Sequence, residues 1–472
     1  MLIRAAELDA WREGGVARIV DVRIAGGRIA AIGAGLPRRG DDEPLIDAGG
    51  AALLPGLHDH HLHLYALAAA LDSLPCGPPE VRDAEALRGA LHARAADLGS
   101  GEWLRGTGYH ESVAGDLDRT ALDALLPGVP LRIQHRSGRL WLLNSAALAE
   151  VESPSGDDPL ERVAGRATGR LYDADDWLRS RLPPRPRSLA RVSVLLARHG
   201  VTGVTDTTHT NDLAAVARFR AAQQRGELRQ RLRLMGDASL DALADTALLR
   251  RGEHKFHLHD HALPDFDALC ADIRRAHAAG RGAAFHCVSR TDLVFALTAL
   301  REAGVRAGDR IEHASVLPPE LLDEVAALRL AVVTQPHFLS ERGDEYRREV
   351  AAEDQPWLYR LRAVLAAGVP LAAGSDAPFG DASPWAAMQA AVERRSRSGH
   401  CFADGEALTP EQALALYLSA PEAPGGALRR IEVGTVSDLC LLDRPWRAAR
   451  ADLAATGCRT TLCGTEVLRA AP

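Results

Sequence analysis

Lysine is almost absent from this chain. Of the 56 basic side chains among its 472 residues, every one is arginine except Lys255. Arginine carries the same positive charge in most contexts, but a guanidinium does not lose its proton to become a nucleophile or the precursor of a metal ligand. A lysine kept in such a chain therefore indicates chemistry that needs an amine.

Other features are missing as well, and each absence excludes a class of protein. No apolar run approaches the roughly 18 residues of a membrane-spanning helix, and the opening residues 1–7 lack the apolar stretch of a signal peptide. The net charge of −7 argues against nucleic acid or an anionic membrane as a partner. We therefore expect a cytoplasmic protein that acts on a small molecule.

Cysteine patterns typical of disulfide frameworks or zinc ribbons are also absent. The seven cysteines include no Cys-x-x-Cys pair, so we expect them to be reduced and mostly apolar in role. The hydrophobic content of 46% is sufficient for a large core, and the length suits one barrel with a small appended domain. A homodimer is compatible with this composition.

Lys255 lies in a segment of roughly alternating character, residues 253–260, that is typical of a strand ending in a polar loop. Three interpretations compete for it. It is a surface lysine, or a Schiff-base amine whose pKa is lowered by burial, or an amine that reacts with carbon dioxide to form a carbamate bridging two metal ions. Residues elsewhere in the chain decide between them.

Histidine and aspartate stand at the ends of successive apolar runs. The run 53–57 leads to His61 and His63, which are two residues apart and therefore share one face of a strand. His286 closes the run 283–285, His313 closes 310–312, and Asp376 follows 371–375. An α/β barrel carries its chemistry at the carboxyl ends of its strands. One such histidine alone is more often structural, but together these residues predict a metal site.

These motifs resemble the amidohydrolase superfamily and, within it, the metal-dependent hydrolases of amidohydrolase family 3. The resemblance extends from residues 22–33, through the signature at 55–63, to residues 433–443. It implies an α/β fold with an eight-stranded TIM-like barrel, and a divalent metal, zinc, as one or two ions per chain. The implied metal ligands are His61, His63 and Asp376 for one ion, His286 and His313 for the other, and carbamylated Lys255 between them.

The resemblance also implies hydrolysis of a carbon–nitrogen bond other than a peptide bond, such as an N-acyl or N-formyl amide, a carbamate or a cyclic amide. A metal-activated hydroxide would attack, with Asp376 as the general base and then the general acid. One alternative keeps the metal site but changes the bond to a lactone, ester or phosphoester. Another keeps the fold as a non-enzymatic scaffold, which predicts lost ligands, and none is lost.

Alternating segments at the two ends of the chain frame the barrel. Residues 1–52 and 430–472 are expected to complete one small β-sandwich. The barrel would then occupy residues 53–429. Residues 66–190 form a long insertion between its first and second strands, at the mouth where substrate enters.

Substrate specificity is predicted to depend on this insertion and on two histidines beside it. Trp103 and Arg139 lie in the insertion, and Arg139 stands where the resemblance suggests a histidine. An arginine in the pocket wall would bind a substrate carboxylate. The alternatives are that Arg139 pairs with an acidic neighbour on the surface, and that Trp103 belongs to the insertion core. His209 and His337, after the second and seventh strands, would bind substrate or orient a ligand. The role of Asp173 stays open.

Three more histidines, His257, His259 and His261, follow Lys255 closely. They fit either a separate metal site or a loop that lines the pocket. The loop is preferred because no carboxylate or cysteine completes a recognisable metal-binding spacing with them.

Overall fold

The computed structural model describes residues 1–78, 80–99, 101–153, 156–182 and 187–468. Its central feature is an eight-stranded parallel sheet in the order β19-β18-β17-β16-β15-β14-β13-β6. Each strand pairs with a parallel neighbour, as the βα repeat of a barrel requires. The strands are β6 Leu57–Leu62, β13 Val201–Asp206, β14 Arg231–Gly236, β15 Leu249–His257, β16 Ala283–Cys287, β17 Arg310–His313, β18 Ala331–Thr334 and β19 Leu371–Ala373.

The sheet closes between its first strand, β6, and its last, β19. The backbone N–H of Asp376 donates to the carbonyl of His61 at 2.7 Å. The carboxylate of Asp59 accepts from the backbone N–H groups of His61 and Ser375, each at 3.0 Å. A Cβ at Gly374 would lie 2.4 Å from the nitrogen of His61, so only glycine allows this approach. The predicted TIM-like barrel is therefore confirmed.

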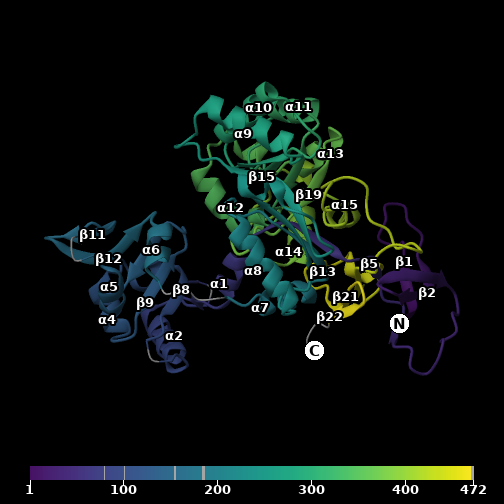
Figure 1. Cartoon of the computed structure of the whole chain (residues 1–472), viewed down its shortest axis with the longest axis horizontal. Helices are drawn as coiled ribbons and strands as arrows, with labels where there is room; N and C mark the ends of the chain where they lie inside the picture. The colour runs from purple at the N-terminus through teal and green to yellow at the C-terminus, as the bar shows by residue number, and fades with distance from the viewer. Residues whose placement is uncertain (79, 100, 154–155, 183–186, 469–472) are drawn as a thin grey trace. The chain divides into compact units, whose positions relative to one another are not determined.

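Helices follow most barrel strands and cover the sheet (Figure 1). One of them, α10, begins with a capping box between Ser289 and Asp292, which satisfies its first backbone N–H groups. No helix in the described ranges is both long and apolar enough to cross a membrane. The helical elements are α7 Ala190–Arg198, α8 Leu213–Gln224, η1 Ala238–Ala242, α9 Phe266–Ala278, α10 Arg290–Ala303, α11 Pro319–Ala327, α12 Phe338–Glu349, η2 Gln355–Trp357, α13 Leu361–Ala366, α14 Pro384–Glu393, η3 Asp404–Glu406 and α15 Pro410–Ala415.

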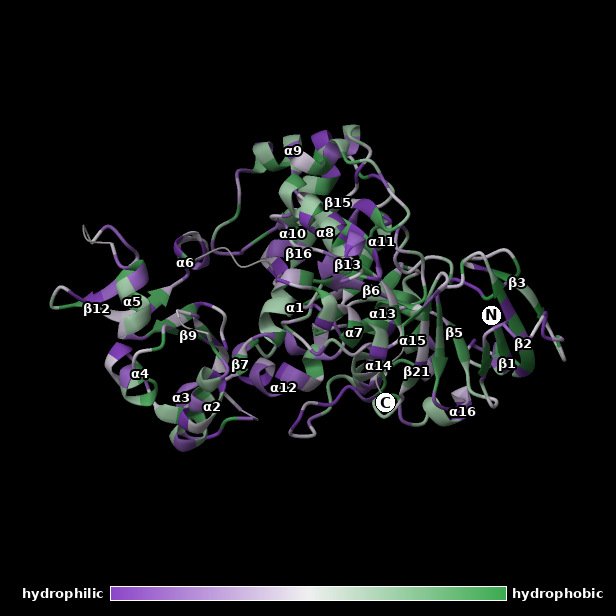
Figure 2. Ribbon diagram, turned by 60° about the horizontal axis from the view of Figure 1, so that its bottom comes forward, coloured by the Kyte–Doolittle hydropathy of each residue, from purple (hydrophilic) through white to green (hydrophobic). Residues whose placement is uncertain are grey.

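The two ends of the chain form a small β-sandwich, as the sequence predicts. One sheet has the order β3-β2-β1-β4 and the other β22-β21-β20-β5. Their facing apolar side chains, such as Ile3, Val22 and Leu441, share one core, and strands β1, β2 and β5 are coloured hydrophobic in Figure 2. The elements are β1 Leu2–Leu8, β2 Arg18–Ala25, β3 Arg28–Gly33, β4 Leu45–Asp47, β5 Leu53–Pro55, β20 Leu439–Leu442, α16 Trp446–Ala449, β21 Cys458–Cys463 and β22 Glu466–Leu468.

Residues 65–188 form a second compact unit, separate from the unit made by residues 1–64 and 189–472. Its six-stranded sheet has the order β11-β12-β10-β9-β8-β7. Two apolar cores hold it together, one around Leu87 and Leu122 and the other around Trp141 and Leu148. The elements from Leu64 onward are α1 Leu64–Leu71, β7 Leu74–Pro75, α2 Ala84–Ala96, β8 Leu104–Tyr109, α3 Glu111–Ala114, α4 Arg119–Leu125, β9 Leu131–His135, β10 Leu140–Leu143, α5 Ser145–Val151, β11 Leu160–Val163, β12 Arg166–Tyr172 and α6 Asp175–Arg181.

The buried Asp59 at the barrel closure leads to a prediction about pH. Burial raises its pKa to about 6, so ionisation costs the folded state free energy as the pH rises from about 4 to about 6. Asp59→Asn keeps the accepting oxygen but removes the charge. We expect the variant to melt above wild type at neutral pH, by about 3 kcal/mol of stability, and to lose this advantage near pH 4. A melting-temperature difference that is the same at both pH values would contradict this expectation.

Candidate metal centre

The six candidate ligands lie at or just beyond the carboxyl ends of five barrel strands. His61 and His63 come from the end of β6, Asp376 from the loop after β19, and the remaining three from neighbouring strands. Lys255 on β15, His286 on β16 and His313 on β17 lie on three adjacent strands of the sheet. This edge is where TIM-like barrels carry their active sites.

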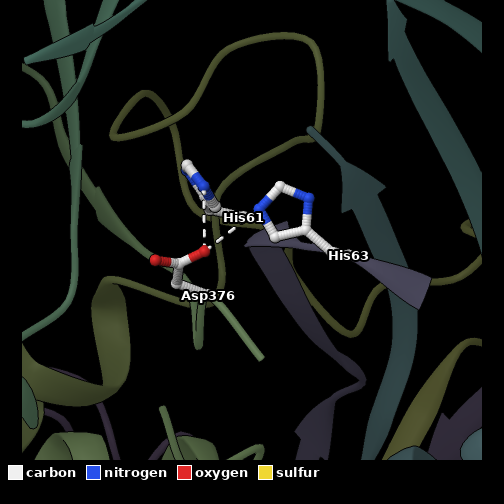
Figure 3. A group of neighbouring side chains, drawn as sticks. All are labelled: His61, His63 and Asp376. Atoms are coloured by element: carbon white, nitrogen blue, oxygen red, sulfur yellow. Dashed lines mark ion pairs between the residues drawn. The ribbon is translucent and has the colours of Figure 1, made fainter. Parts of the chain in front are cut away.

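Three of these side chains converge in space (Figure 3). The Nε2 atoms of His61 and His63 lie 3.4 Å and 3.2 Å from Oδ1 of Asp376. Their potential ligand atoms all fall within 4.8 Å of one another, and no other group of three or more histidine, cysteine, aspartate or glutamate side chains in the described part of the chain does so. Two imidazole nitrogens and one carboxylate oxygen form a donor set that suits zinc.

The other three candidates lie close to this group. The ring centre of His313 is 4.8 Å from that of His61 and 4.5 Å from that of His286. Lys255 is only 6% exposed, and its Nζ has no hydrogen-bond partner among the described residues. Burial lowers the pKa of this amine. A buried lysine with an unsatisfied, weakly basic amine favours the interpretations that need a neutral amine over that of a surface lysine.

The protonation states of His286, His313 and Asp376 suit metal binding. Burial, then the charge of His61, lowers the pKa of His313 to about 3, and burial with the charge of His313 lowers that of His286 further. Burial by itself would raise the pKa of Asp376, but the hydrogen bond and charge of His61, together with His63, hold it well below its ordinary value. His286 and His313 therefore present neutral nitrogens at neutral pH, and Asp376 a carboxylate.

Two site residues also have strained backbones. His313 and Asp376 adopt φ angles of 68° and 51°, in the left-handed region that non-glycine residues rarely enter. Each costs of order 1–3 kcal/mol, and such strain clusters at functional sites. The surrounding contacts must therefore hold these two residues in place.

The family is decided by comparison with known proteins. The profile of the amidohydrolase family matches residues 44–468. The chain belongs to the amidohydrolase family. The predicted family is thereby confirmed.

Two relatives align with most of this amidohydrolase, and a solved structure shares its fold. The chain is 26% identical to the N-substituted formamide deformylase of Arthrobacter pascens, with 90% of each chain covered. It is 23% identical to protein LONG AFTER FAR-RED 3 of Arabidopsis thaliana, covering 94% of this chain and 87% of the relative. The crystal structure of an uncharacterized metal-dependent hydrolase from Pyrococcus horikoshii superposes with a TM-score of 0.77 at 19% identity, covering 94% and 97% of the two chains. That likeness shows a shared fold.

The second compact unit of this amidohydrolase contains Arg139 and Trp103. The Arg139 guanidinium donates two hydrogen bonds to Asp173, at 2.8 Å and 2.6 Å, and both side chains are more than half exposed. Trp103 is buried in the core of this unit and donates to Glu150 at 2.7 Å. These are the arrangements that the two alternative interpretations describe, and substrate binding by either residue stays a prediction.

His209 and His337 take different positions in the barrel unit. His209 is exposed after β13, with its ring centre 4.7 Å from that of His257. His337 is 1% exposed, and its Nε2 lies 2.9 Å from the carbonyl oxygen of Ser375, next to Asp376. His337 is therefore placed to support the loop that carries Asp376, and His209 faces solvent.

Sequence reasoning missed the residues that orient the imidazoles. Nδ1 of His61 lies 2.6 Å from Glu312, Nδ1 of His63 lies 2.9 Å from Thr208, and Nδ1 of His313 lies 2.7 Å from Gln335. Partners of this kind hold each imidazole ring in one orientation, so that its Nε2 would be free to bind a metal ion. Of these partners, only Glu312 could have been noticed in the sequence. It stands two residues after Arg310 on one strand, so two buried charges of opposite sign share a face of that strand.

Glu312 supports a testable expectation. It is fully buried, and Arg310 donates to its second oxygen at 2.5 Å. Glu312→Gln retains the shape of the side chain but replaces one carboxylate oxygen with an NH2 group. Either His61 or Arg310 would then lose its hydrogen-bond acceptor. We expect metal affinity to fall about 10–100-fold, measured by competition with a chromogenic chelator. Glu324→Gln, which removes the charge of a more exposed carboxylate paired with Arg301, is the control. Equal affinities of the Glu312 variant and wild type would contradict this role.

Proposed function

We propose that this amidohydrolase is a zinc enzyme that removes N-formyl or N-acyl groups from a small substituted amine. The observation that carries the proposal is the convergence of His61 and His63 on Asp376 beside the buried amine of Lys255. In this assignment His61, His63 and Asp376 hold one ion, and His286 and His313 are the protein ligands of a second.

Lys255 is assigned a carboxylated side chain, whose two oxygens would serve both positions. Its burial and its lack of any hydrogen-bond partner in the described ranges support this, because a carbamate would convert an unsatisfied amine into two oxygen donors. The lowered pKa supports it too, since only a neutral amine adds to carbon dioxide. No arginine could take this place.

A bound dication would polarise the substrate carbonyl and lower the pKa of water. Asp376 remains a carboxylate because its pKa is held low, so it is able to accept the proton of the attacking water. The same carboxyl group then returns that proton to the leaving nitrogen, which departs as a neutral amine. Glu312 keeps the His61 ring in one orientation throughout.

The substrate class is proposed from a relative whose name states a specific activity. The Arthrobacter pascens relative is an N-substituted formamide deformylase and aligns over 90% of both chains. A formyl group also presents less steric bulk than any other acyl group. The surface pairing of Arg139 with Asp173 gives no support to a carboxylate requirement in the amine portion.

A matched substrate panel tests this proposal. Zinc-loaded wild type is given N-benzylformamide, N-benzylacetamide, an aryl lactone and an aryl phosphoester, and release of acid and amine is followed by chromatography. We expect turnover of the formamide, weaker turnover of the acetamide, and a loss of roughly 10²-fold or more with Asp376→Asn. Cleavage of the lactone or phosphoester without cleavage of either amide would contradict it.

A further inference from the structure

A second cluster of imidazoles lies outside the candidate ligand set. His257 is the last residue of β15, His259 follows it by two residues, and His209 comes from the loop after β13. The ring centre of His257 lies 4.7 Å from that of His209 and 4.3 Å from that of His259. All three side chains are exposed.

The two spacings that involve His257 are close to those of imidazole pairs that share an ion. With Zn–N distances of about 2.1 Å and tetrahedral angles, two imidazole ligands place their ring centres roughly 5 Å apart. His257 meets this condition with both partners. The potential ligand atoms of the three rings do not all lie within 4.8 Å of one another in the structure, so binding an ion would require the side chains to turn toward it.

The donor atoms of the cluster determine which metal ions it would bind. Its donors are imidazole nitrogens, which suit zinc, nickel and copper, whereas calcium and magnesium prefer oxygen. Spacing along the sequence does not reveal it, because His209 precedes His257 by 48 positions and meets it only when β13 and β15 take their places in the barrel.

We propose that His209, His257 and His259 form an accessory site for a borderline dication such as Zn²⁺, Ni²⁺ or Cu²⁺, additional to the centre at His61, His63 and Asp376. The ring of His257 also lies 4.5 Å from that of His286. The accessory ion would therefore sit beside the candidate centre.

Zinc stoichiometry tests the accessory site independently of hydrolysis. Purified wild type, His209→Ala/His259→Ala and the control His92→Ala, which removes an exposed imidazole from α2, are dialysed against increasing Zn²⁺. Bound zinc per chain is then measured by plasma mass spectrometry, after thermal melting has shown that each protein is folded. The double variant keeps His257, which contacts His286, so that the neighbouring centre is disturbed least.

We expect wild type and His92→Ala to bind one more ion per chain at saturation than the double variant, with the tightest-bound ions equal in all three. The same loss is expected with Ni²⁺ as the probe. Equal saturation of the double variant and wild type would overturn the proposal. A fall in kcat/KM of the double variant with unchanged stoichiometry would also overturn it, by assigning these imidazoles to the substrate.

Discussion

Asp376→Asn is expected to lower kcat roughly 10²–10⁴-fold. The Asp376 oxygen lies 3.2 Å and 3.4 Å from the imidazoles of His63 and His61, and those interactions hold its pKa low. Asparagine retains the size and one oxygen, but it neither accepts the proton of water nor carries the charge that a dication favours. Initial rates with the formamide substrate, at saturating zinc, measure the effect.

A nearby carboxylate provides the matched control. Asp381→Asn changes an exposed aspartate five residues further along the same loop, which accepts from the backbone N–H of Ser383. It should keep kcat within about twofold of wild type, as exposed substitutions usually do. Retention of wild-type kcat by Asp376→Asn would assign proton transfer to another group.

Lys255→Ala and Lys255→Arg are both expected to lose activity, each by about 10²-fold or more, because neither side chain forms a carbamate. The arginine variant distinguishes better between the two possible roles of Lys255. It retains a positive charge, so a purely electrostatic role for Lys255 predicts partial activity, whereas a carbamate predicts none. Rates are compared with and without added bicarbonate.

Bicarbonate provides an internal check on this second prediction. Wild type stripped of metal and carbon dioxide should regain activity when zinc is added only if bicarbonate is present, and Lys255→Arg should regain none. Full activity of Lys255→Arg would contradict the carbamate. Trapping of a carbonyl substrate on Lys255 by borohydride would instead restore the Schiff-base interpretation.

Much of the fold followed from local patterns. The turn at Gly26–Gly27 and the alternating segments around it predicted the sandwich, and apolar runs closed by histidine or aspartate predicted the barrel strands. Such patterns are readable because the period of a strand and the chemistry of its end lie within a few residues. The family was predicted from several of these motifs in order, and it is confirmed.

The hydrogen-bond partners of individual side chains could not be predicted from such patterns. Glu312 is 251 positions from the His61 ring that it orients, and Asp173 is 34 positions from Arg139. No local period connects residues at such separations, because the tertiary fold alone brings them together. The same limit hid the neighbourhood of His209 and His257. The assignment of metal ligands remains a prediction that the convergence of His61, His63 and Asp376 supports.

Metal content per chain tests the central claim most directly. Wild type and Lys255→Ala, both prepared with bicarbonate and zinc and desalted identically, are analysed by plasma mass spectrometry. The carbamate-bridged centre predicts two tightly held ions in wild type and one or none in the variant. One ion in both proteins would remove Lys255 from the centre, and no tightly held metal in either would contradict the account of a metal-dependent hydrolase.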